Sequence, residues 1–217
     1  MWSFKGTRVH WLGHDSIVLQ GSRTVIIDPF RAKGDYSADV LLISHEHFDH
    51  LSEDDIGRFA SASTTIVAPR ICEEALKKFR QEKKIVTTNA KLEVKGLTIE
   101  TVPAYNIDKF REPGRVFHPR EDDRVGYVIT MDGARFYHAG DTDFIPEMRA
   151  LDVDVAFLPV SGTYVMTAEQ AAEAAVAMET KYAIPMHIAS IVGTLDDAQK
   201  FKSLVGKDRE VVILERE

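Results

Sequence analysis

The chain has 217 residues, of which 44% are hydrophobic and 28% charged, and its formal net charge is −7. These values suit an ordinary globular protein with a real core, and we expect one domain over residues 1–217. The acidic balance argues against a surface that coats nucleic acid. There is no apolar run of about 18 residues, so no membrane span is expected.

Cys72 is the single cysteine, which excludes an intrachain disulfide and a metal site built on thiolates. The first six residues lack the apolar core of a signal peptide. Both observations favour a cytoplasmic protein.

The first ninety residues predict mainly short strands. The first three are runs of apolar and β-branched residues bounded by turn residues such as Gly13 and Gly21, and they are expected to form an antiparallel meander. Ser52 is the expected N-cap of a short helix that ends at Phe59, with Asp55 three residues on. Pro69 predicts the start of a second helix, from Arg70 to about Glu82. The expected strands are 8–12, 16–20, 24–28, 40–43, 64–68, 85–87, 91–94 and 97–102.

The second half begins with a long segment, residues 106–124, that has no clear periodicity and is expected to be a functional flap. It carries five charges of each sign: Lys109, Arg111, Arg115, Arg120 and Arg124 against Asp108, Glu112, Glu121, Asp122 and Asp123. Regular structure is then expected as a hairpin at 126–130 and 134–138, a strand at 153–160, a helix from Thr167 to about Glu179, a strand at 182–187, a helix at 195–204 and a strand at 211–214. Because strand-rich halves each finish with helices, we expect an α/β fold with two mixed sheets stacked between helical layers.

One stretch, residues 44–51, carries the chemistry. It places three histidines and an aspartate in the order H-x-H-x-D-H, immediately after a buried strand and before a helix: His45, His47, Asp49 and His50. Imidazole nitrogen and carboxylate oxygen are ligands for Zn²⁺ and its first-row neighbours. On a strand the first two histidines share a face, and the turn must aim the other two residues elsewhere. That geometry suits two adjacent ions better than one, whereas a histidine-rich surface loop has no need of this spacing.

Two later residues suit the same site. Asp141 follows a strand, and Gly140 before it allows a sharp turn. A carboxylate there could bridge two ions about 3.5–4 Å apart. His187 also ends a strand and suits a ligand to the second ion. Either residue alone would be read as structural.

These motifs together resemble the metallo-β-lactamase superfamily, over nearly the whole chain. The resemblance implies an αββα sandwich, one ion on His45 and His47, another on Asp49 and His50, and a bridging Asp141. More narrowly, the runs 11–14, 27–29, 137–142 and 184–187 resemble metal-dependent hydrolases related to ascorbate-6-phosphate lactonases, which bind zinc, manganese or similar ions.

The chain departs from the superfamily pattern at one point. The usual mid-chain histidine is replaced by Asn106, a poor ligand, after Pro103-Ala104-Tyr105. We expect His118 to substitute for it and Asn106 to contact substrate. His14 could face substrate or support a ligand, and His138 could orient Asp141.

The predicted function is that of a metal-dependent hydrolase. There is no serine triad, P-loop or dinucleotide-binding glycine pattern, so the simplest nucleophile is a metal-held hydroxide, with Asp49 and His14 as catalytic candidates. We expect two divalent ions, zinc first and manganese, nickel or iron as alternatives, and a small ester, lactone or phosphodiester as substrate. The alternatives are a nuclease of the same fold and a non-enzymatic metal-binding protein. His47 argues against an oxygen-reducing di-iron type, which has glutamate there. Neither a membrane nor nucleic acid is an expected partner, and a homo-oligomer is left open.

Overall fold

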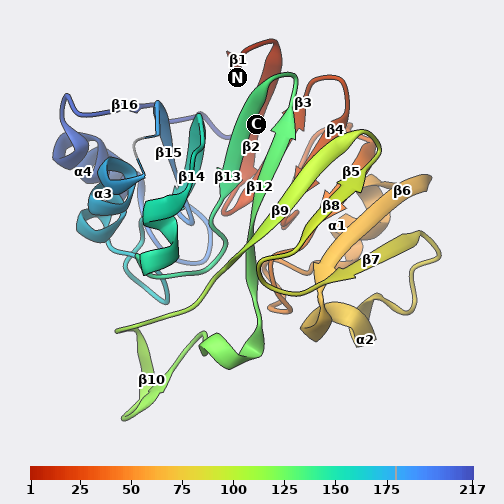
Figure 1. The fold of residues 1–217 in the computed structure, drawn as a ribbon, viewed down its shortest axis with the longest axis horizontal. Coiled ribbons are helices and arrows are strands. Elements are labelled where there is room, and N and C mark those ends of the chain that lie inside the picture. The colour runs from red at the N-terminus through yellow and green to blue at the C-terminus, as the bar shows by residue number, and fades with distance from the viewer. Residues whose placement is uncertain (179) are drawn as a thin grey trace.

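Two β-sheets stack face to face, with helices on their outer faces, in the computed structural model, which describes residues 1–178 and 180–217 (Figure 1). The strand order is β1-β2-β3-β4-β5-β6-β7 in the first sheet and β16-β15-β14-β13-β12-β9-β8 in the second. Both sheets mix antiparallel and parallel pairs. The expectation of two mixed sheets between helical layers is confirmed.

The strands of the first sheet come from the first 86 residues. They are β1 (Trp2–Phe4), β2 (Thr7–Gly13), β3 (Ser16–Gln20), β4 (Thr24–Ile27), β5 (Ala38–Leu42), β6 (Ala60–Pro69) and β7 (Glu82–Val86). The expected meander is β2-β3-β4, and β4 to β7 then pair in parallel. Strand β1 and the full length of β6 were not anticipated.

The strands of the second sheet come from the rest of the chain. They are β8 (Lys91–Val94), β9 (Leu97–Pro103), β12 (Val125–Met131), β13 (Ala134–His138), β14 (Val155–Pro159), β15 (Tyr182–Met186) and β16 (Glu210–Val211). The predicted hairpin is β12-β13, and β13 to β16 are parallel. The last strand is shorter than expected.

The helices cover the outer faces of the sheets (Figure 1). They are α1 (Glu53–Phe59), α2 (Glu73–Leu76), α3 (Ala168–Ala177) and α4 (Leu195–Val205), with short 3₁₀ turns η1 (Arg70–Cys72), η2 (Arg120–Asp122) and η3 (Pro146–Ala150). Ser52 caps α1, as predicted, and α3 begins after Thr167, which caps it in a capping box with Gln170. The expected end of that helix at Glu179 lies outside the described residues. No helix in the described ranges has the length and apolar character needed to cross a membrane.

Two predictions of secondary structure were wrong. The helix expected from Arg70 to Glu82 is a 3₁₀ turn and one α-helical turn that ends at Leu76. The chain must reverse there, because β7 begins at Glu82 and pairs in parallel with β6. The segment 106–124, expected to lack regular structure, contains a small hairpin of β10 (Phe110–Glu112) and β11 (Arg115–Val116), which projects from the body in Figure 1.

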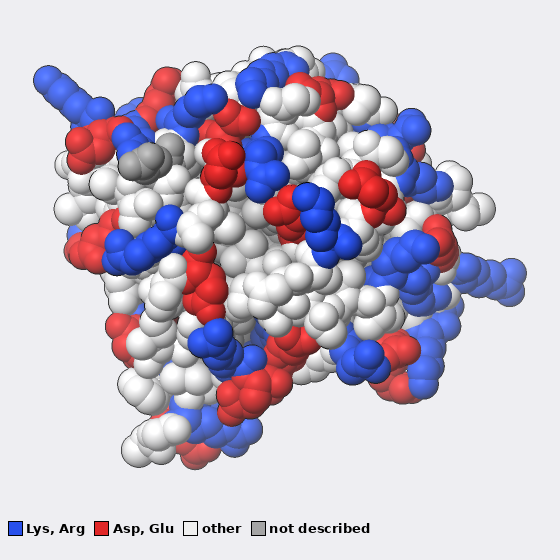
Figure 2. Space-filling model, viewed as in Figure 1, with Lys and Arg blue, Asp and Glu red and all other residues white. Residues whose placement is uncertain are grey.

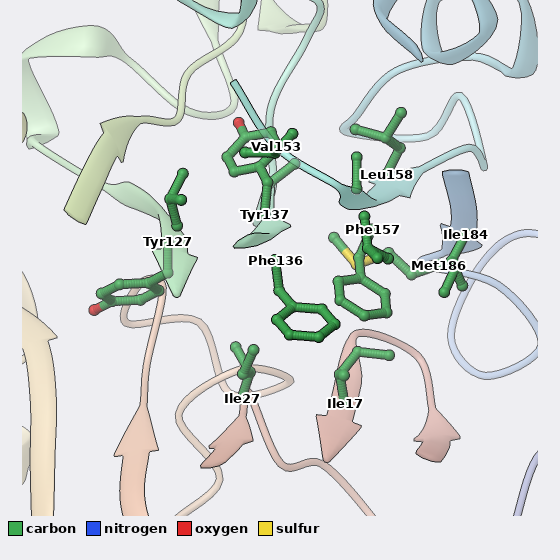
Figure 3. Packing of buried hydrophobic residues seen from close by; sticks show 14 of the residues in the cluster. Ile17, Ile27, Tyr127, Phe136, Tyr137, Val153, Phe157, Leu158, Ile184 and Met186 are labelled. Carbon is green, nitrogen blue, oxygen red and sulfur yellow. The ribbon is translucent and has the colours of Figure 1, made fainter. Parts of the chain in front are cut away.

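The larger apolar core lies between the sheets and beneath α3 and α4. Figure 3 shows Phe136 and Phe157 pointing from the second sheet toward Ile27 and Ile17 of the first. All four side chains are fully buried. A smaller core packs the outer face of the first sheet against α1 and α2. Burial of this kind contributes about 1.5–3 kcal/mol of stability per large apolar side chain. It therefore holds the two sheets together at the edge where polar residues follow the strands.

Candidate metal centre

The chemistry-bearing residues follow the carboxyl ends of strands from both sheets. Strands β4 and β5 run in parallel, as do β13 and β15 with β14 between them. Parallel strands bring their carboxyl ends to one edge of a sheet. Asp28, the 44–51 turn, Asp141 and His187 follow these strands, and His14 follows β2. Stacking the two sheets therefore brings residues from five segments to one place.

The backbone is left-handed at several of these strand ends. The φ angles are 51° at His14, 43° at Asp28 and 60° at His187, although none of them is glycine. Such conformations cost about 1–3 kcal/mol each and persist where the surrounding structure imposes them, often at functional sites. Gly140 has a φ of 64°, and a Cβ there would lie 3.1 Å from the Cβ of Ser44, as the predicted sharp turn requires.

Eight predicted or suspected site residues form two adjacent groups. The first group is His45, His47, His118 and Asp141; the second is His14, Asp49, His50 and His187. Within each group the potential ligand atoms lie within 4.8 Å of one another. The structure thus brings His118 to the same group as the H-x-H pair, and it brings His14 into the second group.

Asp141 lies between the groups. Its Oδ2 is 3.9 Å from His45 Nε2 and 3.5 Å from His118 Nε2. Its Oδ1 is 3.3 Å from His50 Nε2 and 3.4 Å from His187 Nε2. One carboxylate oxygen therefore faces each group, which is the arrangement a bridging ligand needs.

Hydrogen bonds at Nδ1 orient the imidazoles of this centre. His118 Nδ1 is 2.9 Å from Asn106 Oδ1, and His50 Nδ1 is 2.9 Å from Asp28 Oδ2. Both oxygens are acceptors, so both Nδ1 atoms donate and both Nε2 atoms carry a lone pair. His187 Nδ1 is 2.8 Å from the Ser161 hydroxyl, which itself donates to the carbonyl of Thr163. The same tautomer follows for His187.

Several of these Nε2 atoms face the carboxylate of Asp141, and an ionised carboxylate is an acceptor without a proton to donate. Within the described part of the chain, the unpartnered buried atoms of the centre include Nε2 of His50, His118 and His187 and Oδ1 of Asp141. Buried polar atoms are normally satisfied, and facing acceptors at 3.3–3.5 Å repel. A proton or a cation must sit between them. Two atoms bound at about 2.1 Å to one tetrahedral ion would lie about 3.4 Å apart, so the donor set fits a metal.

The pKa shifts of the histidines separate into two kinds. Burial lowers the pKa of His14 and His118 to about 4 and that of His45 well below its ordinary value. These rings are therefore neutral at pH 7, as ligation requires. Burial acts in the same direction on His50, but Asp141 outweighs it and holds the pKa of His50 well above its ordinary value. A proton there occupies the place that a cation would take.

Asn106 lies beneath His118 and away from the mouth of the site. Its Oδ1 accepts from the backbone N–H and Nδ1 of His118, and its Nδ2 donates to Asp143 and to the carbonyl of Tyr164. The side chain is buried, and its polar atoms are used internally. This placement favours a role in positioning His118 over the expected contact with substrate.

Two buried aspartates were not proposed from the sequence. Asp28 accepts from the backbone N–H and hydroxyl of Ser44 and from His50, so it holds the turn and a ring together. Asp15 is fully buried, and neither of its carboxylate oxygens has a hydrogen bond among the described residues, although Oδ2 lies 3.7 Å from His50 Nε2. It forms a third overlapping group with His50, Asp141 and His187. The one feature of the sequence that could have identified Asp15 as a site residue is its position directly after His14. His138 Nε2 donates to the carbonyl of Asp15 and its Nδ1 accepts from the N–H of Gly140, the residue before Asp141, so it supports the loop that carries Asp141.

A nearly buried ion pair joins the turn to the 106–124 segment. Arg124, which is 6% exposed, makes a two-pronged contact with Glu46, the residue between His45 and His47. Its third nitrogen donates to the carbonyl of Phe117, 3.2 Å away. One guanidinium therefore links the H-x-H motif to the residue before His118.

Residues of both groups line an open pocket of about 420 Å³, three from the first group and Asp49 from the second. His47, Asp49, His118 and Asp141 form its polar lining. The rest of the lining is Phe48, Arg111, Phe117, Tyr164 and Ile191. A small molecule can thus reach both groups from solvent.

The chain is similar to known proteins over nearly all of its length. A family model described as a beta-lactamase superfamily domain matches residues 8–187. A UPF0173 metal-dependent hydrolase of Pyrococcus furiosus is 30% identical over 95% of this chain and 96% of its own. A candidate metal-dependent hydrolase from Parabacteroides distasonis is 33% identical, with a TM-score of 0.83 over 97% of this chain and 94% of its own. CmlA, a diiron β-hydroxylase from Streptomyces venezuelae, shares the fold alone: identity is 13% and TM-score 0.75, over 100% of this chain and 54% of CmlA.

Fold, site and family model together define the class of protein, a metallo-β-lactamase-fold member of the beta-lactamase superfamily. Within that superfamily the chain belongs to the UPF0173 family of metal-dependent hydrolases. It is therefore a metal-dependent enzyme, and the alternative of a non-enzymatic metal-binding protein is set aside.

Proposed function

We propose that this hydrolase holds two divalent transition-metal ions and cleaves a small ester, lactone or phosphodiester. The observation that carries the proposal is the convergence of oriented imidazole nitrogens on both oxygens of Asp141. Zinc suits this nitrogen-rich set best, and manganese, nickel or iron are alternatives. The inclusion of lactones follows the resemblance to ascorbate-6-phosphate lactonases.

The proposed ligands divide between the ions as the two groups do. His45, His47 and His118 would hold the first ion, and Asp49, His50 and His187 the second, with Asp141 between them. His14 and Asp15 are further candidate ligands of the second ion, since each lies in an overlapping group. Because these residues come from both sheets, we also infer that residues 1–217 act as one domain. Its single buried cysteine, Cys72, supports a cytoplasmic location.

Divalent ions bound here would supply an activated water and polarise the scissile oxygen. The chain's own residues supply the rest. Asp49 lines the pocket, and one of its oxygens is 3.1 Å from His14 Nε2. The His14 contact holds the carboxylate in place and lowers its pKa against the opposing effect of burial. Asp49 is therefore ionised at neutral pH, the form that can orient water and accept its proton, with His14 as its positioning partner.

The remaining residues keep the geometry rigid. Asn106 fixes the tautomer of His118, Asp28 that of His50, and Ser161 the orientation of His187. Groups of this kind typically alter metal affinity or activity by about 10- to 100-fold when they are removed.

A nuclease function within the same fold is less well supported. On the face shown in Figure 2, Lys and Arg alternate with Asp and Glu and form no field of one sign. Nucleic-acid binding would need a basic surface along the backbone path.

The test is elemental analysis of protein purified without added metal, followed by a panel of esters, lactones and phosphodiesters. We expect two equivalents of first-row metal and turnover of at least one class, lost in Asp141→Ala. One equivalent of metal or less, or Asp141→Ala protein that binds two ions with unchanged affinity, would overturn the dinuclear proposal. Metal-replete protein that is inactive on the whole panel would overturn the substrate range.

A further inference from the structure

The pocket that leads to the two metal-binding groups has exposed apolar side chains in its wall, although its base is polar. Phe48 is 67% exposed, Ile191 40% and Tyr164 38%, and all three line the pocket. Large exposed apolar side chains gathered around one cavity indicate a surface that binds an apolar group.

Each exposed aromatic ring of this wall packs against a second aromatic ring. Tyr164 adopts a left-handed backbone with a φ of 69° although it is not glycine, and its carbonyl accepts from Asn106. Its ring packs edge-on against Phe117, with centroids 4.7 Å apart. The ring of Phe48, another lining residue, packs edge-on against Phe30, with centroids 5.7 Å apart. Rigid aromatic walls suit a flat or bulky apolar group at little entropic cost.

Arg111 is the cation of the pocket lining. It lies on the exposed hairpin strand β10 and has no hydrogen bond or ion pair with any of the described residues. The other four cations of the 106–124 segment are paired: Lys109 with Asp108 and Asp143, Arg115 with Glu112, Arg120 with Glu147, and Arg124 with Glu46. The unpaired guanidinium is therefore the one that borders the pocket. Guanidinium binds carboxylate and phosphate groups in two-pronged fashion.

We propose that the substrate combines an apolar, preferably aromatic, body with an anionic group remote from the bond that is cleaved. The apolar body packs between Phe48 and Tyr164, and the carboxylate or phosphate pairs with Arg111. This inference rests on the proposed hydrolytic function for its reaction: water adds a hydroxyl to the acyl carbon, the acyl–oxygen bond breaks, and the leaving oxygen takes the proton. Arg111 determines specificity and is remote from the bond that breaks.

The test uses matched probes that differ only in the remote group. The anionic probes are the 4-nitrophenyl monoester of 1,4-phenylenediacetic acid and the same ester of 4-(phosphonomethyl)phenylacetic acid. The neutral probe is 4-nitrophenyl 4-methylphenylacetate. Binding of the three corresponding non-hydrolysable anilides to the metal-loaded enzyme is measured by calorimetry, so the preference is read without turnover.

We expect an anionic anilide to bind about 10- to 100-fold more tightly than the neutral one, the scale of a charge-assisted two-pronged contact. Arg111→Gln should abolish that preference without altering the melting temperature. Arg115→Gln is the matched control, because Arg115 is exposed on the same hairpin but does not line the pocket. Phe48→Ala should weaken all three anilides alike. Whichever anionic anilide binds more tightly, the carboxylate or the phosphonate, identifies the remote group as carboxylate or phosphate.

Equal affinity of wild type for the neutral and both anionic anilides would overturn the inference. So would a preference that survives Arg111→Gln, because the metal ions themselves would then be the source of the attraction. A preference that depends on Arg111 without hydrolysis of any ester probe would support the inference while counting against ester hydrolysis.

Discussion

The ion pair between Arg124 and Glu46 gives the sharpest test of how the site is held together. We predict that Arg124→Met destabilises the metal-loaded enzyme and loosens His118. The change keeps much of the side-chain length but removes the two-pronged contact with Glu46 and the donor to the carbonyl of Phe117. It also removes the contact with Asp122, 3.2 Å away.

The size of the effect follows from burial. Breaking a fully buried pair costs about 3–5 kcal/mol. Here the Arg124 side chain is 6% exposed but that of Glu46 is 29% exposed, so water can partly solvate the carboxylate that is left. We therefore expect a loss of about 3 kcal/mol in the free energy of unfolding, including about 1 kcal/mol for the unpaired carbonyl of Phe117. In a chain of this size that lowers the melting temperature by about 6–12 °C.

The assay is urea unfolding of a double-mutant cycle with Glu46→Gln, together with calorimetric titration of Zn²⁺ into chelator-treated protein. We expect a coupling energy of about 1.5–3 kcal/mol and about a 10- to 100-fold weaker affinity for one ion. Arg115→Met serves as control, since its exposed pair with Glu112 should contribute at most about 0.5 kcal/mol. A coupling energy below about 0.5 kcal/mol, with both ions bound as in wild type, would refute the reasoning and leave Asn106 to hold the segment alone.

Further predictions concern the metal groups themselves. Asp141→Ala should lose both ions, so that adding Zn²⁺ no longer raises its melting temperature; retention of either ion at wild-type affinity would contradict the bridge. His118→Ala should lose one ion entirely. Asn106→Ala should lower the affinity for the same ion by about 10- to 100-fold, because it removes the acceptor at His118 Nδ1. Equal metal content in wild type and both variants by elemental analysis would count against this. Asp15→Asn should reduce the rise in melting temperature that added Zn²⁺ gives, because it replaces a candidate carboxylate ligand of the second ion with an amide, which is a weaker ligand; an unchanged rise would count against Asp15 as a ligand. Chelation of wild type should lower its melting temperature, and a scan unchanged by chelator would mean that the ions do not support the fold.

The sequence by itself determined the fold class and predicted the metal-binding turn at residues 44–51. Alternation and turn residues give most strands their correct places, because short strands bounded by glycine or proline have few alternatives. The spacing of His45, His47, Asp49 and His50 predicts metal chemistry without any contact being known. Helical periodicity was a poorer guide at Arg70 to Glu82, where the pairing of β7 with β6 overrode local propensity.

Only the tertiary structure decided how the distant parts of the site meet. His118 reaches the first group because Asn106 receives its N–H groups and because Arg124 holds the residue before it, and neither contact follows from spacing. Asp15 and Asp28 are ordinary aspartates in sequence, and they become part of the centre only when two sheets stack and exclude water from them. Arg111 differs from the four other cations of the 106–124 segment in lining the pocket and in having no ion pair with a described residue. Local pattern specifies which elements form, whereas burial and pairing across sheets specify which polar groups are left free to bind a ligand.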